Sequence, residues 1–185
     1  MNALQKRKNI TSYLLALAGF AVAVFADQLT KYLAVLFLKN AQPFTVIDGV
    51  FEFHYLENRG AAFGLMQNRQ FVFVIGAAAI FIIFAYLYGK LPHEKKYYPL
   101  RICAVLLCAG AVGNMIDRLR LNYVIDFLYF KLIDFPIFNV ADCYVVISCI
   151  SFVLLISFYY RDDSDFDFLK SGKKNGTQDE SKKEN

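Results

Sequence analysis

Four aspartates in the second half of the chain stand among apolar neighbours: Asp117, Asp126, Asp134 and Asp142. Burying a carboxylate in such surroundings is costly, so one that is kept there usually has a role. Asp142 is the strongest candidate because it is the only charged residue in a long apolar stretch. It also stands in the first turn of an expected helix, where the helix dipole favours a negative charge. Two such carboxylates brought together would share a proton and could act as an acid and a base.

The pattern leaves the second member of this pair open. Asp126 and Asp134 each lie between apolar residues, and neither composition nor spacing separates them. Asp117 adjoins Arg118 and Arg120, which would hold it ionised and favour a structural role. The residues alone therefore predict one carboxylate pair with one uncertain member.

The elements that hold these aspartates are expected to be membrane helices. Of the 185 residues, 57% are hydrophobic and 19% are charged, which is more apolar than an ordinary globular chain. A bilayer span takes about 17 to 25 apolar residues, and we expect four spans, at about 11–38, 70–88, 100–116 and 140–160. The formal net charge of +4 is scattered among these runs, so no nucleic-acid partner is expected.

The remaining segments follow other patterns. From about residue 41 to residue 66, apolar and polar residues alternate as in β-strands on either side of the turn dipeptide Asp48-Gly49. This pattern predicts a small β-hairpin or cradle. Residues 117–139 are too polar to span but rich in aromatic side chains, which favours an amphipathic connection at the membrane interface. Residues 162–185 have almost nothing to bury and predict a disordered tail. The expected fold is an all-α membrane protein with a single domain at 1–161.

Positively charged segments predict the orientation in the membrane. Lys and Arg are frequent at the N-terminus, in the loop after the second span and in the tail, so both termini are expected in the cytoplasm. The β region and the amphipathic connection then lie on the extracytoplasmic, periplasmic side. The N-terminal segment imitates a cleavable signal, but its apolar pattern resumes at Tyr32, which favours an uncleaved helix. Asp27 and Lys31 share one face of this helix, as a structural ion pair or as support for the active site.

Four blocks of the chain resemble the signal peptidase II family, the lipoprotein signal peptidases of bacteria. The blocks, in order, are residues 27–31, 57–64, 110–118 continuing to 124–127, and 135–142. The resemblance implies Asp126 and Asp142 as the catalytic pair of an aspartic endopeptidase. It implies Asn114, Arg118 and Asn139 as neighbours that order the site. It further implies that Asn58 contacts the substrate and that Asp27 and Lys31 support the fold or the site.

The same resemblance implies the reaction and the partners. The substrates would be diacylglyceryl-modified prolipoproteins in the bacterial cytoplasmic membrane, cut immediately before the lipidated cysteine. Membrane lipids are the other expected partner, the enzyme would be a monomer, and neither a metal nor another cofactor is expected.

Three other functions are compatible with parts of the pattern. Intramembrane carboxylates are also typical of proton-coupled transporters. Against a transporter, the charges gather at one end of the spans and no internal repeat is visible. A metal-dependent lipid phosphotransferase would need several carboxylates at ligand spacing on one helix, and the chain has none. A catalytically inactive scaffold is the third alternative, which the four intact blocks disfavour.

Overall fold

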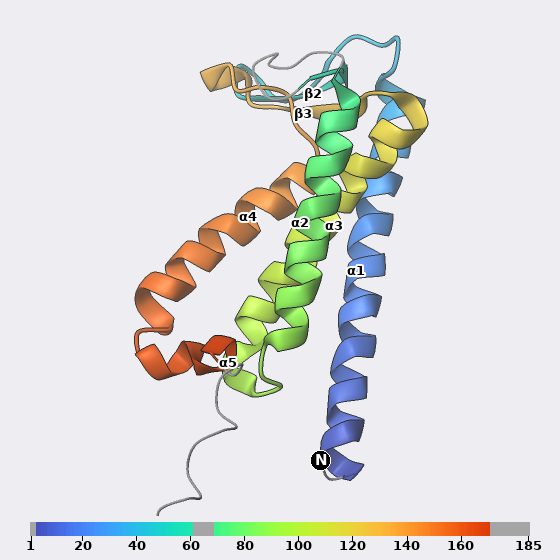
Figure 1. Ribbon diagram of the computed structural model, residues 1–185. Coiled ribbons are helices and arrows are strands. Elements are labelled where there is room, and N and C mark those ends of the chain that lie inside the picture. The colour runs from blue at the N-terminus through green and yellow to red at the C-terminus, as the bar shows by residue number, and fades with distance from the viewer. Residues whose placement is uncertain (1–2, 61–68, 171–185) are drawn as a thin grey trace, which may run out of the picture.

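The computed structural model describes residues 3–60 and 69–170 of the chain. Four long helices run side by side, and a small sheet lies across one end of them (Figure 1). The helices are α1 (Ala3–Leu38), α2 (Gln70–Lys90), α3 (Tyr98–Leu121) and α4 (Val140–Leu154). Each contributes to a helical segment long and apolar enough to cross a membrane; these segments are Asn9–Leu38, Gln70–Lys90, Lys95–Leu121 and Val140–Tyr159. The predicted class of fold is confirmed.

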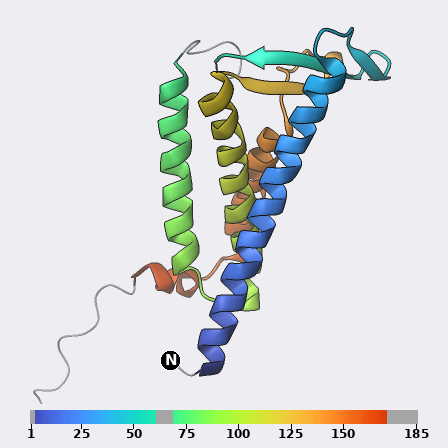
Figure 2. The same cartoon turned by 90° about the vertical axis from the view of Figure 1, so that its right-hand side faces the viewer.

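Helix α3 is the centre of the bundle. It packs against α1, α2 and α4, and Figure 2 shows it between α1 and α2. Small residues permit this close packing. A Cβ atom on Gly110 would lie 2.5 Å from the Ala141 carbonyl oxygen, and one on Gly113 would lie 2.5 Å from the Asp27 carboxylate. Both glycines are therefore required for α1 and α4 to approach α3 at the end that carries the sheet.

The sheet has three antiparallel strands in the order β1 (Phe44–Ile47), β2 (Phe51–Asn58) and β3 (Val124–Tyr129). The predicted hairpin is present, with Gly49 in the left-handed region (φ 68°) between β1 and β2. The third strand comes from the segment that the sequence assigns to an amphipathic connection. It pairs Asp126 with Leu56 and Val124 with Asn58. The β region therefore includes part of 117–139, because the free edge of β2 can accept a second partner.

The amphipathic connection is also shorter than expected at its start. Helix α3 continues to Leu121, where Asn122 ends it in the left-handed conformation (φ 62°). Asp117 is therefore a helical residue, and it is buried. The helix can continue through Asp117 because the carboxylate of Asp117 is paired with Lys31 inside the protein. The apolar pattern of α3 does not reveal this partner.

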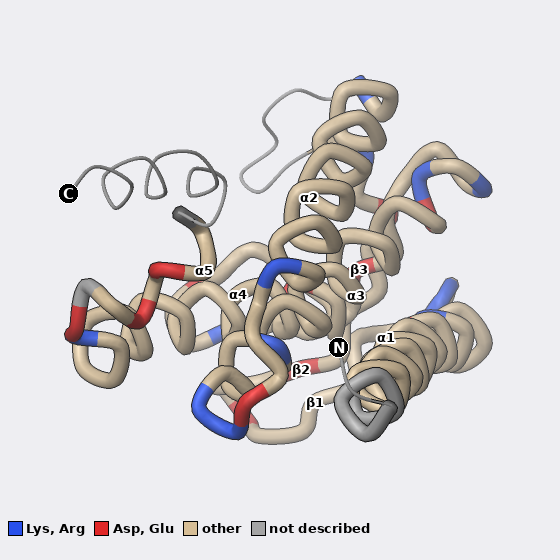
Figure 3. Tube along the Cα trace, turned by 60° about the horizontal axis from the view of Figure 1, so that its bottom comes forward, with Lys and Arg blue, Asp and Glu red and all other residues tan. Residues whose placement is uncertain are grey.

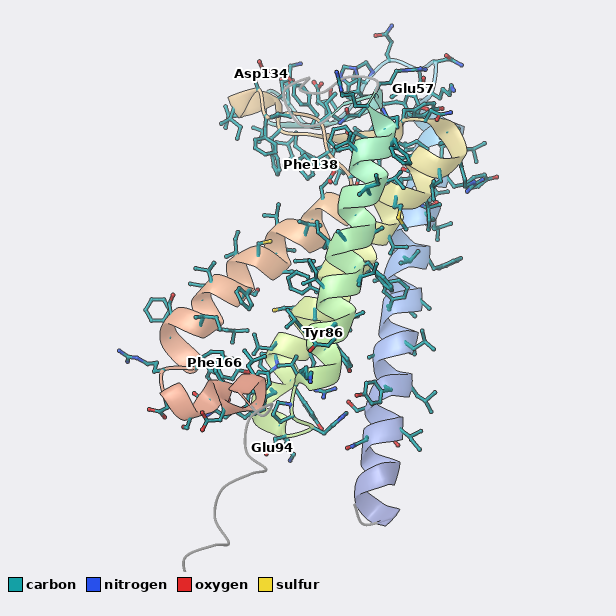
Figure 4. The ribbon with its side chains drawn as sticks, viewed as in Figure 1. Glu57, Tyr86, Glu94, Asp134, Phe138 and Phe166 are labelled. Carbon is teal, nitrogen blue, oxygen red and sulfur yellow. The ribbon has the colours of Figure 1, made fainter. Side chains whose placement is uncertain are left out.

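The opposite end of the bundle is closed by an aromatic cluster. Tyr97 and Tyr160 stack there with a centroid distance of 5.7 Å. The chain then forms two short helical segments, Asp163–Phe166 and Asp167–Lys170, of which the second is α5. Phe166 and Phe168 pack against the cluster, and Figure 4 shows Phe166 at this end. The predicted disordered tail therefore does not begin at 162, since these aromatic side chains have a surface to cover; residues 171–185 lie outside the described chain.

Charged residues avoid the middle of the bundle. Figure 3 shows Lys, Arg, Asp and Glu mainly toward the ends of the helices and in the connecting segments. Several charged residues are buried at the sheet end of the bundle, and one of them, Asp126, lines a pocket there.

Candidate active site

A pocket of about 620 Å³ opens at the sheet end of the bundle. Its polar side chains are Asn58, Asn114, Arg118, Asp126 and Asp142. The rest of the wall is mostly apolar and comes from β3, α4 and the segment between them: Val124, Phe130, Ile133, Phe135, Pro136, Ile137, Phe138, Cys143, Val146 and Ile147. Two carboxylates that lie 16 positions apart in the sequence thus face one mostly apolar cavity.

Asn139 joins the two carboxylates. Its side-chain amide Nδ2 donates to Asp126 Oδ1 at 2.6 Å, and its backbone N donates to Asp142 Oδ2 at 3.1 Å. The Asn139 side-chain oxygen in turn accepts from the Asp142 backbone N at 3.1 Å. This reciprocal pair of bonds is a capping box at the start of α4. The cap that begins the helix therefore also sets the orientation of Asp142.

Two further amides complete the contacts of the carboxylates. Asn58 Nδ2 donates to Asp126 Oδ2, and Asn114 Nδ2 donates to Asp142 Oδ1, each at 2.8 Å. Asn58 can reach Asp126 because β3 pairs with β2 next to it. Each carboxylate thus has two amide N–H donors, which fix its position without pairing it directly with a cation. None of the ion pairs found within residues 3–60 and 69–170 involves either aspartate.

Burial raises the pKa of Asp126 to about 7, and the negative charge of Asp142 adds to this effect. The bonds from Asn58 and Asn139 act in the opposite direction because they favour the ionised form. The pair therefore binds a proton near neutral pH that an exposed aspartate would have released. Coupled groups of this kind titrate as a unit.

A buried ion-pair group lies directly behind the pocket. Lys31 Nζ lies 3.0 Å from Asp27 Oδ2 and 2.9 Å from Asp117 Oδ2, and it donates to Asn114 Oδ1 at 2.8 Å. The two aspartates and the lysine are each at most 3% exposed. Because Lys31 occupies the amide oxygen of Asn114, the Asn114 nitrogen is directed to Asp142.

The same group holds the backbone next to each pocket aspartate. Asp27 Oδ1 accepts from the backbone N of Ala141 at 2.9 Å, and Asp117 Oδ2 accepts from the backbone N of Ile125 at 3.2 Å. Ala141 directly precedes Asp142, and Ile125 directly precedes Asp126. The ion-pair group therefore positions the two polar segments that meet in the pocket.

The structure brings together all eight site residues that the resemblance implies. Asp117 and Gln28 join them. The sequence favours a structural role for Asp117 and gives no role to Gln28. Gln28 Nε2 donates to Asp117 Oδ1 at 3.0 Å and to the Gly113 carbonyl at 3.2 Å. The available signal was helical spacing, since Asp117 follows Asn114 and Gly113 by three and four positions on one face of α3.

Asp134, the alternative partner, lies elsewhere. It is exposed, and its carboxylate accepts from the Tyr129 hydroxyl at 2.7 Å. Figure 4 shows Asp134 at the outer tip of its loop, well away from the labelled Glu57 at the end of β2. It is not among the residues that line the pocket. Residues 61–64 of the second sequence block lie outside the described chain.

The fold and the pocket define a class: a multi-pass membrane protein with a buried polar site at one end of its bundle. Within residues 3–60 and 69–170, no group of three or more His, Cys, Asp and Glu side chains is placed to hold a metal ion. A family model described as signal peptidase (SPase) II matches residues 19–159. The chain belongs to the signal peptidase II family, and the family predicted from the four blocks is confirmed.

Individual relatives agree with this assignment. The lipoprotein signal peptidase of Caldanaerobacter subterraneus subsp. tengcongensis is 42% identical over 78% of this chain and 97% of its own length. That of Clostridium tetani is 38% identical over 77% of this chain and 90% of its own length. A solved structure of a bacterial membrane enzyme, 29% identical, superposes with a TM-score of 0.68 over 80% of this chain and 92% of that chain. The protein is thus a bacterial membrane peptidase, and nothing supports the transporter alternative.

Proposed function

We propose that the protein cleaves the signal peptide of lipid-modified prolipoproteins, with Asp126 and Asp142 as its catalytic pair. The observation that carries this proposal is the placement of both carboxylates in one mostly apolar pocket, linked by Asn139. The raised pKa of Asp126 supports it, because an aspartic mechanism needs one protonated and one ionised carboxyl group at working pH.

The reaction is hydrolysis by a water held between the two carboxyl groups. The ionised aspartate takes a proton from this water, whose oxygen adds to the carbonyl carbon of the scissile peptide bond. The protonated aspartate donates its proton to the carbonyl oxygen as the tetrahedral intermediate forms. When the intermediate collapses, the C–N bond breaks and a proton passes to the leaving amine. Asn58, Asn114 and Asn139 keep the two carboxyl groups in place throughout.

The pocket wall supports a lipidated peptide as substrate. Its apolar side chains, Phe135, Ile137 and Val146 among them, can bury acyl chains or the apolar part of a signal peptide. Arg118 also lines the pocket and can donate to a peptide carbonyl. The relatives in Caldanaerobacter and Clostridium carry the name lipoprotein signal peptidase, and the scissile bond proposed for this chain directly precedes the lipidated cysteine.

The proposed orientation places the sheet end outside the cytoplasm. Lys90, Lys95 and Lys96 lie at the opposite end of the bundle, and basic loops are retained in the cytoplasm. Both termini are then cytoplasmic and the pocket opens on the extracytoplasmic face. A monomer bound by membrane lipids is sufficient, because one chain supplies both aspartates and all of their amide partners.

Purified protein tests the proposal directly. It should cleave a diacylglyceryl-modified precursor before the modified cysteine and leave the same precursor without lipid uncut. Asp126→Asn should abolish cleavage, and EDTA should leave wild-type cleavage unchanged. Cleavage by Asp126→Asn at the wild-type rate would exclude the aspartic mechanism. Loss of activity in EDTA, restored by a divalent ion, would favour metal-dependent chemistry, and equal cleavage without lipid would remove the proposed substrate class.

A further inference from the structure

Arg118 lines the pocket, and most of its hydrogen-bond donors have no acceptor among residues 3–60 and 69–170. Its Nη1 donates to the Asn114 carbonyl, one turn earlier in α3, at a long 3.3 Å. Its Nε is buried and has no acceptor in the described part of the chain. None of the ion pairs formed by residues 3–60 and 69–170 includes Arg118. A guanidinium carries five N–H donors. One is bonded to Asn114 and the Nε–H is enclosed, so three have no partner in the described part of the chain and can serve a ligand.

An aromatic ring from another helix also contacts this guanidinium. The Cζ atom of Arg118 lies 4.8 Å from the centroid of the Phe73 ring. Phe73 is half-buried on α2, a helix with no fully buried residue that packs mainly on α3. A cation over an aromatic face is attracted by the ring, and a planar guanidinium is also held in orientation by it. Because the hydrogen bond to Asn114 is long, the ring adds a second restraint on the orientation of the guanidinium plane.

We infer that Phe73 is a positioning residue for peptide cleavage: its ring holds the Arg118 guanidinium so that the free N–H donors face a backbone carbonyl of the bound peptide. This inference rests on the proposed function, because it requires the peptide to lie in the pocket beside Asp126 and Asp142. Donors fixed before binding lose less freedom when the substrate arrives, which increases kcat/KM. The inference also gives α2 a part in the site, although α2 supplies no residue to the pocket wall.

Three variants at two positions of α2 test the role of the ring. Phe73→Leu keeps an apolar side chain and removes the aromatic face, so kcat/KM for a lipidated precursor should fall roughly three- to thirtyfold. Phe73→Tyr keeps the face and should stay within about twofold of wild type. Phe71→Leu is the matched control, because Phe71 is on the same helix and 75% exposed. It should leave kcat/KM unchanged. Equal losses for Phe73→Leu and Phe73→Tyr would overturn the inference.

A double-mutant cycle distinguishes positioning from general support of the fold. Arg118→Gln should lower kcat/KM, and adding Phe73→Leu to it should cause no further loss, because the ring acts only through the guanidinium. Additive losses, or a Phe73→Leu variant that is inactive because its melting temperature has fallen, would overturn the inference. So would Arg118→Gln with wild-type kcat/KM. These results leave the proposed function intact as long as Asp126→Asn is inactive, whereas an active Asp126→Asn overturns that function whatever Phe73 does.

Discussion

Two pairs of aspartates lie close together at the sheet end of the bundle, and the protein holds them in opposite ways. Asp27 and Asp117, the ion-paired aspartates, share the ammonium group of Lys31 at 3.0 and 2.9 Å. Asp126 and Asp142, the amide-bound aspartates, accept from asparagine N–H groups and form no ion pair within the described chain. Burial alone does not distinguish the two kinds of aspartate, since Asp117 and Asp126 are 3% and 2% exposed, while Asp142 is partly buried.

The difference lies in the charge of the partner. A lysine within 3 Å binds a carboxylate as an ion pair and fixes its position, which suits a structural role. A neutral amide orients a carboxyl group while leaving it able to gain or lose a proton, which suits acid and base catalysis. The ion-paired aspartates then hold the backbone of Ala141 and Ile125, next to the amide-bound pair. One pair is thus the support of the other.

Neutralising the amide-bound aspartates should have the largest effect on activity. Asp126→Asn and Asp142→Asn each remove one partner of the acid and base pair, so kcat should fall by about 100- to 10,000-fold or more. Folding should persist, because an amide of the same shape takes the place of the carboxyl group. The measurement is cleavage of a lipidated precursor together with thermal unfolding. A large drop in melting temperature would show that this pair is structural after all.

The stability of Asp126→Asn should also depend on pH in a defined way. The pKa of Asp126 in the folded protein, about 7, is above the unfolded value of about 3.9. The folded state therefore binds a proton that the unfolded state releases, and this group lowers stability as pH rises from about 4 to 7. Asp126→Asn lacks this loss, so at pH 8 it should unfold at a higher temperature than wild type. This difference in unfolding temperature between Asp126→Asn and wild type should shrink as the pH is lowered toward 4.

Removing the cation from the ion-paired group should lower stability, whereas neutralising the amide-bound pair lowers activity and leaves the fold intact. Lys31→Met leaves Asp27 and Asp117 buried without a counter-charge, which should cost about 3 to 5 kcal/mol of stability. The amount of folded protein in the membrane should fall accordingly. The triple variant Asp27→Asn, Lys31→Met, Asp117→Asn removes all three charges and should recover part of the stability. If Lys31→Met folded like wild type and lost only activity, the two pairs would not differ in role.

Removing the amide of Asn58 should alter the proton affinity of Asp126 and Asp142, which tests whether neutral partners set their titration. The bond from Asn58 lowers the pKa of Asp126, so Asn58→Ala should raise that pKa. Activity should then be lost at a higher pH on the alkaline side, because the shared proton is retained longer. We also expect roughly a tenfold decrease in kcat from the lost hydrogen bond. The measurement is kcat against pH for both proteins. An alkaline limb that moves to lower pH would contradict the role of Asn58.

Much of this arrangement could be predicted from the sequence. Apolar runs long enough to span a bilayer predict the four helices, and the turn at Asp48-Gly49 predicts the hairpin. Hydrophobic pattern could not choose between Asp126 and Asp134, because both have apolar neighbours in the sequence. Only pairing of β3 with β2 places Asp126 inside, and strand pairing between distant segments leaves no local signal.

The missed residues share the same cause. The sequence indicates the adjacent Arg118 and Arg120 as partners of Asp117, yet its partner is Lys31, 86 positions away in the sequence. Phe73 looks like one more lipid-facing aromatic residue of α2 until Arg118 is found beneath its ring. Residues 163–170 look polar enough to be disordered, but Phe166 and Phe168 have an aromatic cluster to cover. In each case the deciding contact is made between segments far apart in the sequence.

Asp134→Asn should have the smallest effect of all. Asp134 is exposed, and its backbone is in the left-handed region (φ 48°), which asparagine adopts readily. An asparagine oxygen can still accept from the Tyr129 hydroxyl at the place of the present 2.7 Å bond. Stability should change by no more than about 0.5 kcal/mol, and kcat should equal that of wild type. An inactive but folded Asp134→Asn would mean that an exposed loop carboxylate takes part in the reaction, and the contrast between ion-paired and amide-bound aspartates would then no longer explain where the chemistry occurs.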